Sequence, residues 1–316
     1  MRPLVIVTRA LPEPVETRLS ALFETELNAG VASFDRRRLA DALARADAIA
    51  SNVGDRIDES LLAGAGPRLR LIANFGVGTD NIDLAAARAK GIAVTNTPGV
   101  LTDDTADLVM ALILMTMRRL GEGERIVRGG RWRGWKPTDF LGRTLAGKTL
   151  GIVGMGRIGR AVAARATAFG MAVEYHNRAA VPDHPARYRP DLDAMLAEAD
   201  VVSVNAPYGP ATHHLIDARR LALMKAQAVL INAARGAIVD QEALIAALER
   251  GALAGAGLDV YPEEPNVDPR LVAMEQVVLL PHMGSATIET RTAMGMKMVE
   301  NILAFSEGRE PPDRVA

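Results

Sequence analysis

The stretch Thr149–Arg178, TLGIVGMGRIGRAVAARATAFGMAVEYHNR, decides the fold of this chain. It predicts a strand at 150–153, a glycine-rich turn at 154–159, a helix at 160–169 and a second strand at 171–175. In such a unit the first glycine permits a tight turn, the second lets a pyrophosphate approach the backbone, and the third lets the helix pack closely on the strand. The helix then offers free N–H groups and its positive dipole end to phosphates. We therefore predict a dinucleotide site here, although a glycine-rich turn in another kind of α/β protein would show the same pattern.

The overall composition excludes several classes of protein and site. The chain has 316 residues with 37 basic and 38 acidic side chains, a balance that argues against a nucleic acid or a membrane surface held by bulk charge. Because it has no cysteine, disulfides and thiolate metal sites are excluded, and a reducing compartment is compatible with the sequence. We expect a cytoplasmic location and no metal. The N-terminus is typical of a first strand and not of a signal peptide. The longest apolar stretch, 108–117, is about half of what a bilayer span needs.

Predicted strands and helices alternate along the whole chain, which favours parallel sheets with helices on both faces. A long helix from about 104 to 120 can join two lobes, and a final helix from about 288 to 306 would return the chain to the first lobe. The predicted fold class is α/β, with two Rossmann-like, doubly wound parallel-sheet domains and a cleft between them. We predict a substrate domain made of residues 1–98 and 287–316, and a dinucleotide-binding domain made of residues 99–286.

A second glycine-rich segment, NFGVGTDNID at 74–83, follows a predicted strand. Open α/β sheets bind ligands at the carboxyl ends of their strands, and this segment begins at such an end. Gly76 and Gly78 would let backbone N–H groups turn toward an anion. A tight turn leading into the next helix explains the same residues equally well.

Three polar side chains come just after predicted strands in the second half of the chain: Arg235, Glu264 and His282. Since parallel strands bring their carboxyl ends to one edge of a sheet, these residues can converge beside a bound dinucleotide. Arg235 could hold carboxylate and carbonyl oxygens, and His282 could exchange a proton near neutral pH while Glu264 orients it. Taken singly, each has an ordinary explanation as a surface charge, a loop acid or a buried histidine.

These residues carry a resemblance to a known family. Over nearly its whole length the chain resembles the D-2-hydroxyacid dehydrogenases, and the matching motifs occur in the family's order and spacing. They are Phe75–Asp83, Asn96–Asp103, Gly154–Gly159, Asn232–Gly236, Leu258–Pro265 and Pro281–Thr287.

The resemblance implies roles for individual residues. It implies that Arg235 binds the substrate, that Glu264 rather than Glu263 pairs with the histidine, and that His282 is the acid/base. It also implies that the backbone at Val77 and Gly78 holds the substrate carboxylate. The cofactor-binding residues expected on this basis are Gly154, Gly156, Arg157, Ile158, Gly159, Asn177, Arg178, Pro207 and Asp259, the last of these contacting the nicotinamide carboxamide.

Within the family, the segment GGRWRGWKP at 129–137 resembles the glyoxylate/hydroxypyruvate reductases. In those enzymes a tryptophan of the partner subunit helps close the substrate pocket, which implies Trp135 here, with Trp132 as the second choice. The resemblance also implies a homodimer built on the nucleotide domain. The region 121–147 is long for a connection and could be an arm that packs on another subunit, or a surface loop with two tryptophans used for local packing.

The choice between NAD and NADP depends on the end of the second strand of the dinucleotide unit. An acid there would bond the ribose hydroxyls and repel a 2′-phosphate. By the family's spacing that position is Asn177, which is neutral, and the cation Arg178 follows it. Glu174 lies near the expected distance but is too early, within the strand. We therefore predict a preference for NADP(H), with NAD(H) possible.

The resulting hypothesis is an enzyme that reduces a small 2-oxo acid, glyoxylate or hydroxypyruvate, to the D-2-hydroxy acid. Two alternatives stay open. One is a different dehydrogenase on the same scaffold, acting on formate, phosphite, another 2-hydroxy acid or a larger 2-keto sugar acid. The other is a nucleotide-sensing protein without catalysis, which an intact set of Arg235, Glu264 and His282 disfavours.

Overall fold

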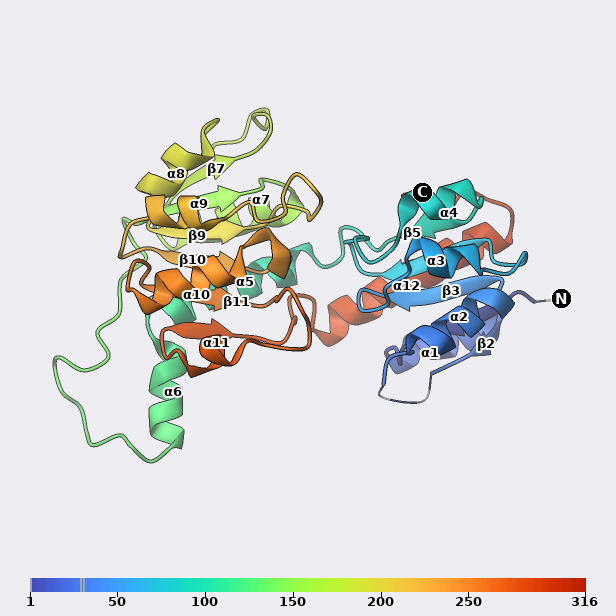
Figure 1. Ribbon diagram of the computed structural model, residues 1–316, viewed down its shortest axis with the longest axis horizontal. Coiled ribbons are helices and arrows are strands. Elements are labelled where there is room, and N and C mark those ends of the chain that lie inside the picture. Colours follow the sequence, from blue (N-terminus) through green and yellow to red (C-terminus); the bar gives the residue numbers. More distant parts are fainter. Residues whose placement is uncertain (1, 29, 31) are drawn as a thin grey trace. The chain divides into compact units, whose positions relative to one another are not determined.

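The computed structural model describes residues 2–28, 30 and 32–316, and the chain forms two compact units (Figure 1). Unit 1 comprises Met1–Leu101 with Ser285–Ala316, and unit 2 comprises Thr102–Gly284. The boundaries therefore fall at 101/102 and 284/285, next to those expected from the sequence at 98/99 and 286/287. Each unit is an α/β layer structure around its own parallel sheet.

The sheet of unit 1 has five parallel strands in the order β2-β1-β3-β4-β5. Its strand order reverses at β1, which pairs with both β2 and β3. At the far edge, β4 and β5 pair so that Ala73 lies opposite Thr95. The strands are β1 (Leu4–Val7), β2 (Glu24–Glu26), β3 (Ala48–Asn52), β4 (Leu71–Phe75) and β5 (Ala93–Thr95).

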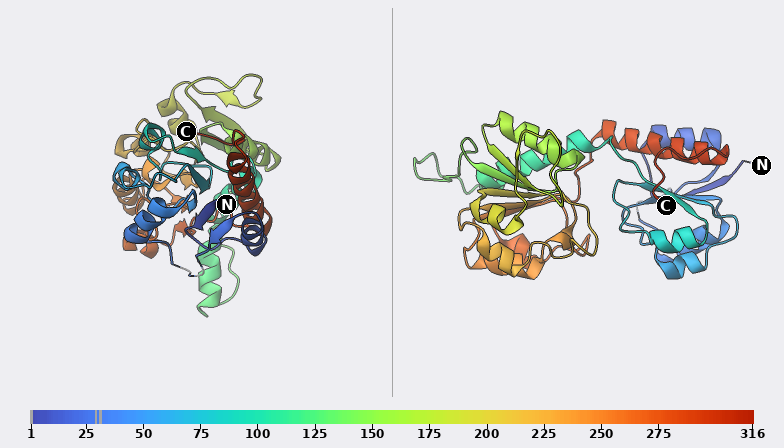
Figure 2. Two further views of the ribbon diagram at one scale, coloured as in Figure 1. Left: turned by 90° about the vertical axis from the view of Figure 1, so that its right-hand side faces the viewer. Right: turned by 90° about the horizontal axis from the view of Figure 1, so that it is seen from above.

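Helices cover both faces of this sheet because the buried strands are apolar on both sides. Along β1, Leu4 and Ile6 pack on one face and Val5 and Val7 on the other, as the two-residue period of a strand requires. The first face is covered by α2 (Arg36–Arg45), α3 (Glu59–Ala63) and α4 (Leu84–Ala89). The second is covered by α1 (Glu13–Leu22) and α12 (Ile288–Ser306), which lie side by side in Figure 2.

The sheet of unit 2 has seven parallel strands in the order β12-β11-β10-β9-β6-β7-β8. The order reverses at β6, which pairs with β7 on one side and β9 on the other, so the ligand-binding crevice of this fold is expected beyond the ends of β6 and β9. The strands are β6 (Thr149–Val153), β7 (Ala172–His176), β8 (Arg187–Tyr188), β9 (Val201–Val204), β10 (Val229–Asn232), β11 (Gly255–Leu258) and β12 (Val277–Leu279).

Two helices pack on one face of this sheet, α5 (Thr102–Met117) and α7 (Arg157–Ala168). The opposite face is covered by α8 (Leu192–Glu198), α9 (Ala218–Leu223), α10 (Gln241–Glu249) and α11 (Pro269–Ala273). A short 3₁₀ turn, η1 (Gly236–Ile238), follows β10. Helix α5 packs on the sheet with an apolar face that is buried at Ala106, Val109, Met110, Ile113 and Met117.

The structure differs from the sequence-based expectation mainly in short elements. The region 121–147 was expected as one long connection, but its first part belongs to helix α6 (Leu120–Arg128), which projects from unit 2 in Figure 1. Gly121 and Gly123 hide the helix in the sequence because glycine has low helix propensity. Strands β2 and β8 and helix α11 are likewise too short to give a periodic signal. Among the described residues, no helix is both long and apolar enough to cross a membrane.

Candidate active site

The three glycines of the turn in unit 2 differ in their steric surroundings. Gly154 has a φ of 102°, and a Cβ there would lie 2.7 Å from the backbone nitrogen of Ala206, in the loop after β9. A Cβ on Gly159 would lie 2.2 Å from the carbonyl oxygen of Gly154, so α7 can lie this close to β6 only without a side chain. A Cβ on Gly156 would meet nothing within 4 Å. The space beside Gly156 is therefore open to a ligand.

The N-terminus of α7 is suited to an anion. Most helices of both units begin at an Asp or Thr whose side chain accepts an N–H of the first turn, as Asp240 does for α10. Helix α7 begins at Gly156 with no side-chain cap. Within the described part of the chain, the N–H groups of Arg157 and Ile158 also have no acceptor. Together with the open space at Gly156, these groups fit the pyrophosphate of a dinucleotide.

The second strand of the dinucleotide unit, β7, ends at His176, so Asn177 and Arg178 lie at its tip. The Asn177 side chain accepts a hydrogen bond of 2.9 Å from the N–H of Met155, which ties the tip of β7 to the glycine turn. Arg178 is exposed. Glu174 lies inside β7 and pairs with Arg187 at 3.2 Å and Arg189 at 3.0 Å. Its carboxylate is therefore engaged away from the strand tip.

A glutamate and a histidine from two different strand ends meet at the carboxyl edge of the same sheet. His282 follows β12, and its Nδ1 lies 2.7 Å from Oε2 of Glu264, in the loop after β11. The other carboxylate oxygen accepts a 3.0 Å hydrogen bond from the N–H of Tyr261. Burial alone would raise the pKa of Glu264, but its hydrogen bond with His282 and the charges of His282 and Arg235 lower it below the ordinary value of 4.5. Glu264 is thus a carboxylate at neutral pH.

Three further contacts hold these loops in place. A Cβ on Gly236 would lie 2.0 Å from the backbone carbon of Tyr261, so the loop after β10 presses directly on the loop that carries Glu264. Asn232, the last residue of β10, donates a 2.9 Å hydrogen bond to the carbonyl of Arg235. The Tyr261 hydroxyl donates to the carbonyl of Leu280, just before His282, at 2.9 Å. These contacts hold the loops that carry Arg235, Glu264 and His282 at the carboxyl edge of the sheet.

Asp259 has a positioning role that the sequence did not reveal. It follows β11 and is buried, and its two oxygens accept hydrogen bonds of 2.8 and 2.9 Å from the N–H groups of Met283 and Gly284. Its own carbonyl accepts the N–H of His282 at 2.8 Å. Burial raises the pKa of this carboxyl, partly offset by the two backbone N–H groups. Asp259 therefore fixes the backbone before and after the His282 side chain. The backbone φ of His282 is 51°.

The remaining predicted residues lie in three different places. Val77 and Gly78 are in unit 1, in the loop after β4, where a Cβ on Gly76 would lie 2.5 Å from a methyl of Val53. Pro207 is in the loop after β9, and its carbonyl accepts the Thr212 hydroxyl at 2.8 Å. Trp135 is 81% exposed.

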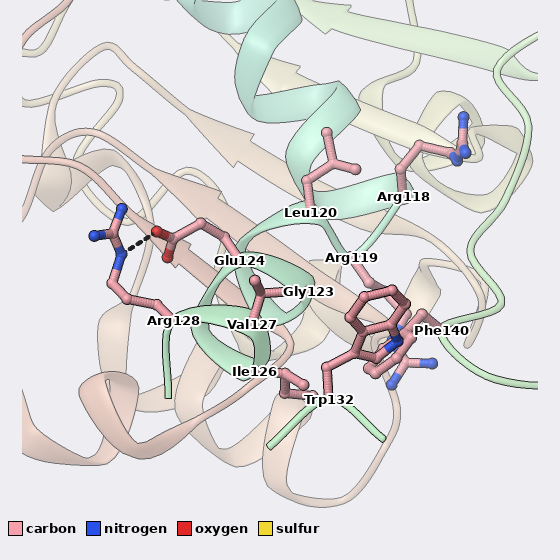
Figure 3. A pocket seen from close by; sticks show the side chains of 10 residues that line it. All are labelled: Arg118, Arg119, Leu120, Gly123, Glu124, Ile126, Val127, Arg128, Trp132 and Phe140. Atoms are coloured by element: carbon pink, nitrogen blue, oxygen red, sulfur yellow. Dashed lines mark hydrogen bonds and ion pairs between the residues drawn. The ribbon is translucent and has the colours of Figure 1, made fainter. Parts of the chain in front are cut away.

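The other tryptophan, Trp132, lines a hollow of about 830 Å³ on helix α6 (Figure 3). Phe140 and apolar side chains of the helix, including Val127, also line this hollow. This hollow is lined by α6 and the segment around it, whereas Glu264 and His282 lie at the carboxyl edge of the sheet. Among the described residues, no group of three or more His, Asp or Glu side chains could hold a metal ion.

Comparisons with known proteins identify the family of this arrangement. The family profile described as "D-isomer specific 2-hydroxyacid dehydrogenase, NAD binding domain" matches residues 110–284. The chain belongs to the D-2-hydroxyacid dehydrogenase family. The resemblance noted in the sequence is thereby confirmed, as are the two-domain α/β fold class and the presence of an NAD-binding domain.

Individual members of the family are similar over the full length. Glyoxylate reductase from Thermococcus litoralis is 45% identical over 323 residues, covering 100% of this chain and 97% of that protein. Glyoxylate reductase from Aeropyrum pernix is 46% identical, covering 99% and 96%. The solved structure of an NADPH-dependent glyoxylate/hydroxypyruvate reductase from Sinorhizobium meliloti, in complex with NADP and malonate, has a TM-score of 0.91 at 38% identity and covers 100% and 97%.

Two glycine variants separate folding from cofactor binding at this turn. Gly159→Ala should lower the melting temperature clearly, because overpacking of this kind costs about 1–3 kcal/mol or more. Gly156→Ala should leave the melting temperature nearly unchanged and weaken cofactor binding by at least about tenfold, since its methyl occupies only the open space beside α7. Thermal melting and cofactor titration of both variants measure this. Equal destabilisation by both substitutions would contradict the distinct roles of the two glycines.

Proposed function

We propose that this dehydrogenase reduces a small 2-oxo acid, glyoxylate or hydroxypyruvate, to the D-2-hydroxy acid with NADPH. The observation that carries the proposal is the 2.7 Å Glu264–His282 pair at the same sheet edge as the open glycine turn. The full-length similarity to glyoxylate reductases supports the substrate class. In this proposal unit 2 binds the dinucleotide and unit 1 contributes to substrate binding.

The histidine geometry supports a role as the proton donor. Glu264 occupies Nδ1 of His282, which leaves Nε2 as the nitrogen that can face a substrate. The nicotinamide supplies the hydride to the carbonyl carbon when the cofactor is bound. His282 delivers the proton to the carbonyl oxygen through Nε2, and Glu264 stabilises the imidazolium before that transfer. The pKa of Glu264 lies below its ordinary value of 4.5. Glu264 is therefore protonated, and the ion pair lost, only after the pH has fallen below 4.5.

The substrate is held by a cation and by backbone groups. Arg235 would bind carboxylate and carbonyl oxygens with its planar fork and polarise the carbonyl. The N–H groups of Val77 and Gly78 would bind the carboxylate. Fixing the acid in this way orients the carbonyl carbon for hydride transfer.

Several residues of unit 2 would bind the cofactor. Gly154, Gly156 and the α7 amides of Arg157, Ile158 and Gly159 would hold the pyrophosphate. Pro207 would flank the nicotinamide. Asp259 would contact its carboxamide with the acceptor capacity that remains beyond its two backbone hydrogen bonds. The preference for NADPH rests on the neutral Asn177 and the exposed Arg178 at the tip of β7, and on the engagement of Glu174 with two arginines.

A homodimer is part of the proposal. Helix α6 has no buried residue, and apolar side chains are exposed on it and on the following segment, namely Leu120, Val127, Trp132, Trp135 and Leu141. An exposed apolar surface of this kind marks an association site. We assign it to a second copy of the chain, with Trp135, or Trp132 if Trp135 is not used, closing the substrate pocket of the partner. Leu120, Val127 and Trp132 of this surface also line the hollow drawn in Figure 3.

The acid/base assignment predicts a large loss of turnover. His282→Ala should lower kcat with glyoxylate and NADPH by at least about a hundredfold, the usual scale for a lost general acid. Glu264→Gln should also slow the reaction, whereas Glu263→Gln, in the exposed neighbouring acid, should not. Initial rates of NADPH oxidation measure these effects. Near-normal turnover of His282→Ala would contradict the assignment, and an inactive wild-type protein would favour a larger keto acid or a sensing role.

The cofactor preference predicts a selective effect at the tip of β7. Arg178→Ala should raise the KM for NADPH by at least about tenfold, because a charge-assisted bond to the 2′-phosphate is lost, and should change the KM for NADH by less than about twofold. Arg187→Ala is the matched control, since Arg187 is also exposed on this edge but pairs with Glu174. Equal effects of Arg178→Ala on both cofactors would remove the case for NADPH.

The dimer proposal predicts the mass in solution. Sedimentation equilibrium should give twice the 33.7 kDa of one chain. Val127→Asp should shift the protein toward single chains by placing a charge in the apolar surface, and Trp135→Ala should raise the KM for glyoxylate while the dimer persists. A wild-type mass equal to one chain would contradict the proposal.

A further inference from the structure

The loop after β4 presents three consecutive backbone N–H groups without an acceptor. They belong to Val77, Gly78 and Thr79, and none of them donates a hydrogen bond within residues 2–28, 30 and 32–316. Consecutive N–H groups of this kind attract an anion only if they are held in the right direction. The direction of each group therefore needs a structural cause.

The cause lies on the opposite side of each peptide plane. In a planar trans peptide the C=O and the N–H point in opposite directions, so holding one fixes the other. The carbonyl of Gly76 thus sets the direction of the Val77 N–H, the carbonyl of Val77 that of the Gly78 N–H, and the carbonyl of Gly78 that of the Thr79 N–H.

Each of these three carbonyls has a donor in unit 1. The N–H of Thr97 donates to the carbonyl of Gly76 at 3.0 Å. The Asn96 side-chain amide donates to the carbonyl of Val77 at 2.8 Å. The Asn74 side-chain amide donates to the carbonyl of Gly78 at 2.9 Å.

The donors are themselves anchored to the sheet. Asn74 is the fourth residue of β4 and is fully buried, and its own oxygen accepts the Ser51 hydroxyl at 3.2 Å. Asn96 directly follows β5, the neighbour of β4, and its backbone N–H donates to the carbonyl of Asp313 at 3.2 Å. The loop is thus held by short side chains on two paired strands.

We propose that Asn96 is a positioning residue for the substrate carboxylate, acting through the Val77 carbonyl to aim the Gly78 N–H, with Asn74 and the Thr97 N–H holding the neighbouring planes. This inference rests on the proposed function, in which the Val77 and Gly78 N–H groups bind that carboxylate. A neutral amide suits the task, because it donates to the carbonyl without adding a charge beside the acid. Without Asn96 the Val77–Gly78 peptide can rotate and turn its carbonyl oxygen toward the substrate, which would repel the carboxylate.

Asn96→Ala tests the inference in the full-length protein. The KM for glyoxylate and the inhibition constant of oxalate should each rise about 5- to 20-fold, as expected for a lost hydrogen bond that had favoured one peptide orientation. The KM for NADPH and kcat should change by less than about threefold.

Asn28→Ala is the matched control. The buried Asn28 also donates to two carbonyls of unit 1, those of Thr8 and Ala32, but neither lies in this loop. It should lower the melting temperature without changing the KM for glyoxylate.

Asn96→Asp provides a second variant of nearly the same shape, with an oxygen in place of the donor. It should raise the KM for glyoxylate at least as much as Asn96→Ala, and it covers the case in which the alanine variant fails to fold. If wild-type protein is active and both variants keep the KM for glyoxylate and the inhibition constant of oxalate within twofold, Asn96 is not a positioning residue. If wild-type protein turns over neither glyoxylate nor hydroxypyruvate, the proposed function fails instead, so the two failures are distinguishable.

Discussion

The parallel pairing of β10, β11 and β12 is the constraint on which the site of unit 2 depends. These strands begin at Val229, Gly255 and Val277, and their parallel register brings their carboxyl ends to the same edge of the sheet. The loops that follow the strands carry Arg235, Glu264 and His282. The close contact of Gly236 with the backbone of Tyr261 leaves no room for a side chain between the loops after β10 and β11. Without this pairing, Glu264 and His282 would be two unrelated loop residues.

The sequence was sufficient for the architecture of two parallel sheets and for the longer strands. Apolar strands with helices between them predict parallel sheets, and the positions of Arg235, Glu264 and His282 after those strands predict their convergence. The sequence could not reveal that Asp259 fixes the backbone around His282, because a buried carboxylate bonded to N–H groups has the same sequence pattern as a loop acid. Helix α6 was missed because Gly121 and Gly123 mask its periodicity.

The same principle recurs in unit 1 with different chemistry. There the strand ends supply amide side chains instead of charged groups, and Asn74 and Asn96 hold the backbone of the loop rather than a titratable side chain. In each unit, side chains at or after strand ends thus hold neighbouring groups in place by hydrogen bonds. In the proposed function the substrate-binding groups of unit 1 are backbone N–H groups, for which a single sequence offers little evidence beyond its glycines.

The most direct test of the central claim is a crystal structure of the full-length protein with oxidised NADP and oxalate, an unreactive analogue of the 2-oxo acid. The account predicts that the pyrophosphate lies against Gly156 and the N-terminus of α7. It also predicts that an oxalate oxygen lies within hydrogen-bond distance of Nε2 of His282 and of the Arg235 guanidinium, with the Glu264–His282 pair intact. A complex with NADP bound at α7 and oxalate remote from His282 would contradict it.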